Sequence, residues 1–225
     1  SPTAGSIGRI VTQNLFAQPF RGPVWLVNPR HTLIEGHACY RSVSALPSPP
    51  DLAVIATPPE TLPSLIAELG AIGTRAAVVI TAGLTPQTKQ AMLDAARPHL
   101  LRIQGPNCLG LALPALGLNA SFSHIMPPVG DLALLSQSGA IVTSVLDWAA
   151  SRKIGFSHVV SLGDMADADF GDLLDYFAGD LSSRAILLYI EQLTHASKFM
   201  SAARRAARSK PVIAIKSGRH AEGAR

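Results

Sequence analysis

Two glycines near the start of the chain have the spacing of a phosphate-binding loop. The segment 5-GSIGR-9 opens a predicted helix that runs to about Phe16. Glycines let the backbone come close to a ligand, and a helix N-terminus offers unpaired N–H groups and a positive dipole end. The first candidate anion site therefore comprises Gly5, Ser6, Ile7, Gly8 and Arg9, with an ordinary glycine-containing turn as the alternative.

A cationic side chain follows the next predicted strand. Strand 24–27 runs into Asn28, Pro29 and Arg30, and no carboxylate stands where a dinucleotide site places Asp or Glu for the ribose. A guanidinium suits a phosphate group through charge-assisted hydrogen bonds. This favours coenzyme A or NADP over NAD, and a plain surface cation is the alternative.

Small and hydroxyl-bearing residues end the following two predicted strands. Open α/β sheets bind ligands in the crevice at the carboxyl ends of their strands. Pro58 has no N–H and would shape a wall there, whereas Thr81 and Ala82 would admit a ligand close to the main chain.

A second strand-turn-helix stands at 136-SQSGA-140, where Ser138 and Gly139 precede a predicted helix. This arrangement favours an anion cradle over a catalytic nucleophile, because the G-x-S-x-G spacing is absent. A simple serine N-cap is the third interpretation. Glu191 follows another apolar strand, so in a parallel sheet it would face the same crevice, as a proton acceptor, a partner for a cation or a helix cap.

Several other functions are disfavoured. The aspartates at 164, 167 and 169 lack the EF-hand pattern, and the seven histidines have no metal-ligand spacing, so we expect no metal site. Two cysteines cannot form a disulfide framework. The basic run 203–210 contains no aromatic residue and predicts a solvated helix face, not a nucleic-acid surface. The apolar runs are too short to cross a bilayer, so we expect a cytoplasmic protein without membrane contact.

The elements that must position these residues alternate along the chain. Of 225 residues, 48% are hydrophobic and 15% charged, which is enough apolar material for a sizeable core. Near-continuous apolar runs, typical of strands buried on both faces, alternate with helical spacing. This predicts an α/β protein with two Rossmann/flavodoxin-like, doubly wound parallel-sheet domains, 1–126 and 127–225. The predicted strands are 24–27, 52–56, 76–80, 101–103, 132–136, 157–161, 185–190 and 211–215.

Taken together, the motifs resemble a known family. The chain is similar to the CoA-binding and ligase-like region of NDP-forming acyl-CoA synthetases, the superfamily that includes the succinyl-CoA synthetase α subunit. The last third most resembles the branch fused to GNAT acetyltransferases in bacterial protein lysine acetyltransferases. The resemblance rests on segments in the expected order: 5-GSIGR-9, 27-VNPRH-31, 53-AVIATPPE-60, 78-VVITAG-83, 105-GPNCLGL-111, 118-LNASF-122, 134-LLSQSGA-140, 161-SLGDMADADFGDLLDY-176, 189-YIEQL-193 and 211-PVIAIKSGR-219.

The resemblance implies roles for individual residues. It places residues 5–9 in a CoA phosphate loop, residues 28–30 at a second-strand CoA contact, and Ile80, Thr81 and Ala82 beside the pantetheine arm. Asn107 and Cys108 match the loop near the thiol end. Ser138 and Gly139 match the helix end that holds phosphate or a phosphorylated histidine, and Glu191 matches the glutamate that steadies this histidine.

Two functions remain open at this point. In the first, the parent protein interconverts acyl-CoA, phosphate and NDP with acid, CoA and NTP through an acyl phosphate and a phosphohistidine. That protein would use ATP or ADP with Mg²⁺ in an ATP-grasp domain or subunit, and residues 1–225 alone would bind CoA or acyl-CoA without turnover. In the second, the region senses acyl-CoA for a GNAT domain. The phosphohistidine loop is expected beyond Arg225, and the resemblance also allows a homo-oligomer.

Overall fold

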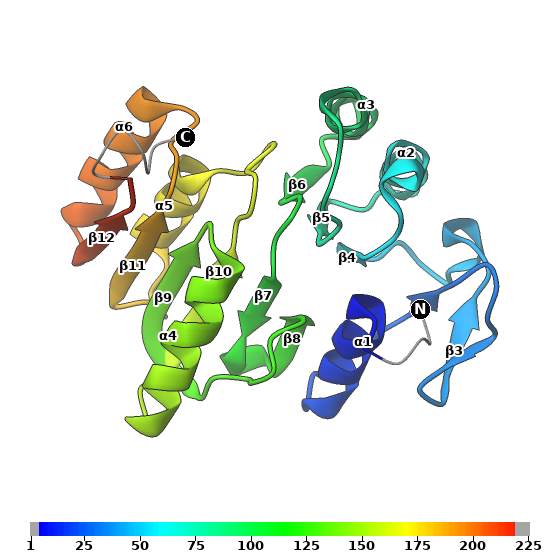
Figure 1. The fold of residues 1–225 in the computed structure, drawn as a ribbon, viewed down its shortest axis with the longest axis horizontal. Coiled ribbons are helices and arrows are strands. Elements are labelled where there is room, and N and C mark those ends of the chain that lie inside the picture. Colours follow the sequence, from blue (N-terminus) through cyan, green and yellow to red (C-terminus); the bar gives the residue numbers. More distant parts are fainter. Residues whose placement is uncertain (1–4, 219–225) are drawn as a thin grey trace.

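A computed structural model describes residues 5–218 and shows helices packed on parallel sheets (Figure 1). The first half contains α1 (Ile7–Ala17), β1 (Leu26–Val27), β2 (Leu33–Ile34), β3 (His37–Tyr40), β4 (Leu52–Ile55), α2 (Leu62–Ala71), β5 (Ala76–Val79), α3 (Pro86–Ala96) and β6 (Arg102–Gln104). The second half contains β7 (Gly110–Leu113), β8 (Leu118–Ser121), β9 (Val129–Ser136), α4 (Gly139–Ser151), β10 (Phe156–Ser161), α5 (Phe170–Gly179), β11 (Ala185–Ile190), α6 (Ala196–Ala207) and β12 (Val212–Lys216).

The first half carries two small sheets. Strands β4, β5 and β6 are parallel neighbours, and β1 pairs in parallel with β3, which also pairs with β2. Helices α2 and α3 bury Leu62, Ile66 and Met92 against Val79 and Ile103. Helix α3 begins after Thr85, whose hydroxyl accepts a hydrogen bond from the Thr88 N–H.

The second half is built on one six-stranded sheet, ordered β12-β11-β9-β10-β7-β8. The first four are parallel, and β7 and β8 continue antiparallel. Helix α4 covers one face and α5 and α6 cover the other (Figure 1). Alternate residues of β11 show this division, because Ile186 and Leu188 pack with α5 and α6 whereas Leu187 packs with α4.

The structure confirms the predicted α/β class and the parallel sheets. It adds two hairpins, β2–β3 and β7–β8, whose short strands lack the long apolar runs used to predict strands. The β7–β8 hairpin precedes residue 126 in the chain but pairs with β10. The division of the domains at residue 126 stays a prediction. Among residues 5–218, none of the helices has the length and apolar character needed to cross a membrane.

Besides the chain itself at residues 105–109, the two halves are held together by hydrogen bonds from the loop between β10 and α5, residues 162–168, which we call the interdomain connection. Its backbone N–H groups at 164, 166 and 168 donate to the carbonyls of Pro106, Gly105 and Ile103, respectively, at 2.9–3.0 Å. Asp167 adds hydrogen bonds from the Arg102 guanidinium at 2.9 Å and from the Ile103 N–H at 2.8 Å. The connection therefore lies along the end of the first sheet and fixes the second half against it.

Candidate functional site

The first candidate loop lies at the beginning of α1. Gly5 has φ of +73°, a conformation that favours glycine, and a Cβ there would meet no described atom within 4 Å. Ser6 is the N-cap residue, and its carbonyl accepts from the N–H groups of Arg9 and Ile10. The first turn of α1 contains no acidic residue. Open space at Gly5 and a helix N-terminus suit a phosphate.

Arg9 forms an ion pair with Glu35, a residue that was not among those predicted from the sequence. Its Nε lies 2.7 Å from a carboxylate oxygen of Glu35, at the tip of the β2–β3 hairpin, and the Gln13 amide donates to the other oxygen at 2.9 Å. Glu35 thus offsets part of the positive charge that the sequence assigned to the loop. Its φ of +51° is the local signal of a tight turn, which the pair Glu35-Gly36 could have suggested.

The second candidate, Asn28–Arg30, forms a turn after β1. The Asn28 side-chain oxygen accepts from the N–H groups of Arg30 at 2.9 Å and His31 at 3.1 Å. An asparagine suits this position because its side-chain oxygen accepts hydrogen bonds from the backbone N–H groups of the tight turn that follows it. Arg30 is exposed, and the Arg41 guanidinium donates to the Pro29 carbonyl at 3.4 Å. The turn therefore brings two arginines to one surface. Through the β2–β3 hairpin it is connected to α1, where Phe16 stacks on His37.

The strand ends predicted to line a crevice do meet. Pro58 follows β4, and Ile80, Thr81 and Ala82 follow β5. The Thr81 hydroxyl donates to the Thr57 carbonyl at 2.7 Å, and the Thr81 carbonyl accepts from the Asn107 N–H at 2.9 Å. Three neighbouring strands are thus joined at their carboxyl ends, and Asn107 lies in this row.

Helix α1 packs beside the same row. Val11 shares a buried cluster with Val78, Ile80 and Cys108. Burial raises the pKa of Cys108 to about 12, and its thiol donates to the Val79 carbonyl at 3.4 Å. Cys108 is therefore a packing residue in its neutral form.

The loop 105–109 carries Asn107 from the first half to the second. Asn107 has φ of +57°, and its side-chain amide donates to Asp164 at 3.1 Å. Two residues on, the Leu109 N–H donates to the Ser161 hydroxyl at 2.9 Å. The loop is therefore fixed on both sides, with Asn107 in contact with the interdomain connection.

Ser138 caps α4 at the carboxyl end of β9. Its hydroxyl accepts from the Ile141 N–H at 3.4 Å, and its own N–H donates to the Ser136 hydroxyl at 3.1 Å. The N-cap interpretation is therefore correct. It is compatible with the anion cradle, because the N–H groups of Gly139 and Ala140 precede the hydrogen-bonded turns of α4.

Glu191 emerges beside this turn. Strands β9 and β11 are parallel neighbours with Ser136 opposite Tyr189, so the residues that follow them leave the sheet side by side. The Gln137 side chain accepts from the N–H groups of Glu191 and Gln192. Gln137 lies within the motif singled out from the sequence, but its role depends on a contact 54 residues away in the chain.

The two candidate regions meet at Leu109. A Cβ on Gly139 would lie 3.4 Å from the Leu109 Cβ, so the beginning of α4 lies against the loop that carries Asn107. A side chain at this position would make ordinary van der Waals contact with Leu109, so the start of α4 and the loop are neighbours. The structure thus brings Thr81 and Asn107 into one row at the end of the first sheet, and Ser138, Gly139 and Glu191 into a second group. The loop at residues 105–109 lies between them.

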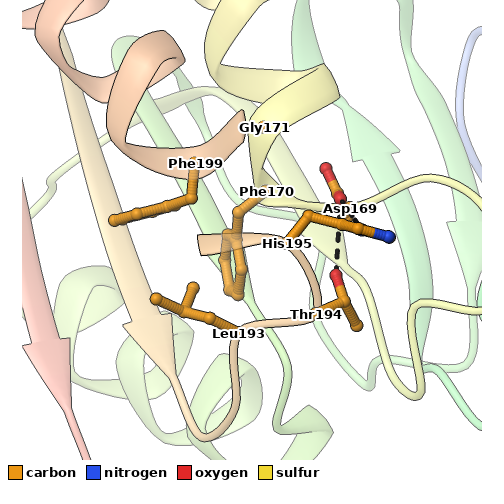
Figure 2. A pocket seen from close by; sticks show the side chains of 7 residues that line it. All are labelled: Asp169, Phe170, Gly171, Leu193, Thr194, His195 and Phe199. Carbon is orange, nitrogen blue, oxygen red and sulfur yellow. Dashed lines mark hydrogen bonds and ion pairs between the residues drawn. The ribbon is translucent and has the colours of Figure 1, made fainter. Parts of the chain in front are cut away.

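A small pocket at the start of α5 has a structural role (Figure 2). Asp169 caps α5 in a reciprocal capping box with Asp172. Its carboxylate also contacts Thr194 at 3.3 Å, His195 at 3.2 Å and Lys198 at 3.0 Å. Asp169 therefore stabilises the start of α5. Among residues 5–218, no cluster of three or more His, Cys, Asp or Glu is arranged to hold a metal ion.

Comparisons with known proteins match both halves. Residues 1–114 match the CoA binding domain family, and residues 129–225 match the succinyl-CoA ligase like flavodoxin domain. An ADP-forming acetate–CoA ligase I from Archaeoglobus fulgidus is 38% identical over 100% of this chain and 33% of its own length. The α subunit of the Pyrococcus furiosus ADP-forming acetate–CoA ligase I is 35% identical over 100% of this chain and 51% of its own.

A solved structure has the same fold. A Candidatus Korarchaeum cryptofilum protein, described as a dinucleotide-forming acetyl-coenzyme A synthetase 1 in complex with phosphate and ADP, superposes with a TM-score of 0.93 and 33% identity. The match covers 99% of this chain and 49% of the other. This chain therefore spans about a third to about half of the length of these relatives. These proteins are ligases or synthetases and do not support the acetyltransferase branch. By the match over residues 1–114 and the fold, the chain belongs to the CoA binding domain family.

Proposed function

We propose that this chain is the CoA-binding and ligase-like part of an ADP-forming acyl-CoA synthetase. The parent reaction converts acyl-CoA, phosphate and ADP into acid, CoA and ATP. The proposed partner is an ATP-grasp domain or subunit that holds ADP or ATP with Mg²⁺, and the proposed location is the cytoplasm. Support comes from the match over residues 1–114 and from relatives whose names describe this activity.

Coenzyme A fits the first half by its chemistry. Its phosphates require N–H donors and cations, which the start of α1 and the Arg30–Arg41 surface supply. Its pantetheine arm would lie along the strand ends at Thr81 and Asn107, which hydrogen bonds join into one row. The ligand would run from the cationic surface along the strand ends, with its thiol near Asn107.

The second half supplies the groups for the phosphoryl chemistry. A phosphate oxygen attacks the thioester carbonyl, the C–S bond breaks, CoA leaves as its thiol after taking a proton, and an acyl phosphate forms. The N–H groups at the start of α4 would hold the phosphoryl oxygens beside Ser138. Glu191 would orient the histidine that next accepts the phosphoryl group, with release of the carboxylate. That histidine is expected outside the described residues.

Two contacts support the proposal: Gln137 joins the start of α4 to Glu191 by a hydrogen bond, and Leu109, in the loop of Asn107, lies next to Gly139. An anion cradle, a carboxylate and the predicted thiol end of CoA thus share one region between the halves. A transfer between thioester and phosphate needs these three groups close together.

Calorimetry on this chain tests the binding half of the proposal. We expect CoA to bind, 3′-dephospho-CoA to bind more weakly, and NADP not to bind. We also expect no acyl-CoA turnover by residues 1–225 with phosphate and ADP. NADP binding without CoA binding would contradict the proposal, and so would full ligase activity of this chain alone.

A further inference from the structure

The two peptide groups that flank Glu191 are held by two residues to which no role has been assigned, Gln137 and Lys216. On one side, the Gln137 Oε1 accepts from the Glu191 N–H at 2.6 Å and from the Gln192 N–H at 2.8 Å. On the other, the Lys216 ammonium donates to the Glu191 carbonyl at 2.8 Å. One contact comes from the end of β9 and the other from the end of β12, so both neighbours of β11 hold its end.

The hydrogen bonds at Gln137 explain why a glutamine suits this position. Two N–H groups converge on one atom, so that atom must be an acceptor with two lone pairs, which the amide oxygen of glutamine provides. The backbone N–H of Gln137 in turn donates to the Tyr189 carbonyl at 3.2 Å. Gln137 thus continues the pairing of β9 and β11 beyond their last regular residues.

The contact matters because Glu191 and Gln192 are exposed and follow the last strand residue, Ile190. Exposed residues at a strand end have few packing contacts that fix their backbone. When the backbone on both sides of Glu191 is held, its Cα stays in one position and the carboxylate can occupy only a limited region. Without these contacts, the carboxylate would sample several positions relative to Ser138.

We propose that Gln137, assisted by Lys216, is a positioning residue that fixes the backbone of Glu191 beside the start of α4. This inference rests on the proposed function for its consequence, since it assumes that Glu191 orients the phosphoryl-accepting histidine. Gln137 itself touches no reacting atom in this scheme. It acts through Glu191, and its loss lowers the rate of phosphoryl transfer without weakening the binding of CoA by the first half.

Amide hydrogen exchange on this chain tests the positioning directly. Gln137→Met keeps the side-chain length and removes the acceptor oxygen, whereas Gln137→Glu keeps an acceptor. We expect exchange of the Glu191 and Gln192 amides to accelerate about five- to tenfold in Gln137→Met, the equivalent of one hydrogen bond, and to stay slow in Gln137→Glu. Gln90→Met, the same change on the exposed face of α3, is the matched control. Unchanged exchange in Gln137→Met overturns the proposal.

Kinetics of the complete ligase that contains this chain test the consequence. We expect Gln137→Met to lower kcat about tenfold with an unchanged KM for CoA, and Gln90→Met to change neither. In a Glu191→Gln background, Gln137→Met should cause no further loss, because the two residues act as a unit. Additive losses would show that Gln137 acts independently of Glu191 and would overturn the inference.

The two proposals fail in different ways. If Glu191→Gln leaves kcat unchanged, the role of Glu191 in the proposed function is wrong and so is the catalytic consequence drawn for Gln137. If Glu191→Gln lowers kcat but Gln137→Met does not, the proposed function stands and the positioning role is overturned.

Discussion

Asn107 and Asp164 join the two halves of the molecule by a hydrogen bond of 3.1 Å between the side-chain amide and the carboxylate. Lys89, at 3.3 Å, neutralises the same carboxylate from α3. A residue of the proposed thiol end is thus oriented by the interdomain connection. The geometry of the region between the halves therefore depends on the connection as much as on either sheet.

The interdomain connection should tolerate no side chain at Gly163. This residue has φ of +57°, and a Cβ would lie 2.3 Å from the Pro106 carbonyl oxygen and 2.4 Å from that of Asn107. We expect Gly163→Ala to lower the free energy of unfolding by about 2–4 kcal/mol, measured by urea denaturation. Gly36→Ala is the control, because Gly36 has a similar φ and open space around it, and should cost about 1 kcal/mol. Equal losses would contradict the close approach.

Cys108 should resist alkylation in the folded protein. Its pKa of about 12 leaves almost no thiolate at pH 8, and the side chain is buried. We expect iodoacetamide to modify the half-buried Cys39 first, with modification followed by mass spectrometry. In denaturant both cysteines should react at similar rates, which serves as the control. Modification of native Cys108 as fast as that of Cys39 would show that the loop at 105–109 opens readily.

Arg30 should contribute to binding of CoA if it contacts a phosphate. We expect Arg30→Ala to weaken binding by about 1–3 kcal/mol in calorimetry, the range of a charge-assisted hydrogen bond. The loss should be smaller for 3′-dephospho-CoA if the contact is to the 3′-phosphate. Arg204→Ala, on the exposed face of α6, should bind CoA as the unchanged protein does. An unchanged affinity in Arg30→Ala would remove this residue from the site.

Asp169 should stabilise the fold in a pH-dependent way. Burial disfavours its charge, but hydrogen bonds from Lys198, the Asp172 N–H and His195 outweigh it, so the pKa of Asp169 is lowered. A carboxyl with a lowered pKa stabilises the fold above its unfolded pKa of about 3.9 and loses this effect as pH falls below it. We expect Asp169→Asn to cost about 1–2 kcal/mol at pH 7, measured by urea denaturation, and less at pH 3. Asp175→Asn, exposed on α5, is the control, and a pH-independent difference would contradict this assignment.

The regular parts of the fold could be predicted from the sequence because the signals are local. The parallel strands are continuous apolar runs, and α3 and α5 begin at Thr85 and Asp169, whose side chains cap them. The β7–β8 hairpin could not be predicted in this way. Its strands are four residues long, and its pairing with β10 depends on contacts about 50 residues distant in the chain.

Site residues could be predicted from the sequence where a polar or small residue directly follows a predicted strand. Ser138, Gly139 and Glu191 are brought together as expected of parallel neighbours. Glu35, Asp164 and Gln137 were not identified, because each acts through a partner from another element: Arg9, Asn107 and the Glu191 backbone. A single sequence shows residue types and spacing, but such pairs appear only once the chain is folded.

The β7–β8 hairpin has a practical consequence for dividing the molecule. It extends the larger sheet beyond β10, while Asn14 of α1 donates to the carbonyls of Ser121 and Ser123, in and just beyond this hairpin. A fragment starting at residue 127 would lack β7, so the backbone donors and acceptors of β10 that pair with β7 would be exposed at the edge of the sheet. Exposed strand edges can pair with other chains and cause aggregation. Expression of the C-terminal half alone therefore calls for a cut upstream of Gly110, with the hairpin retained.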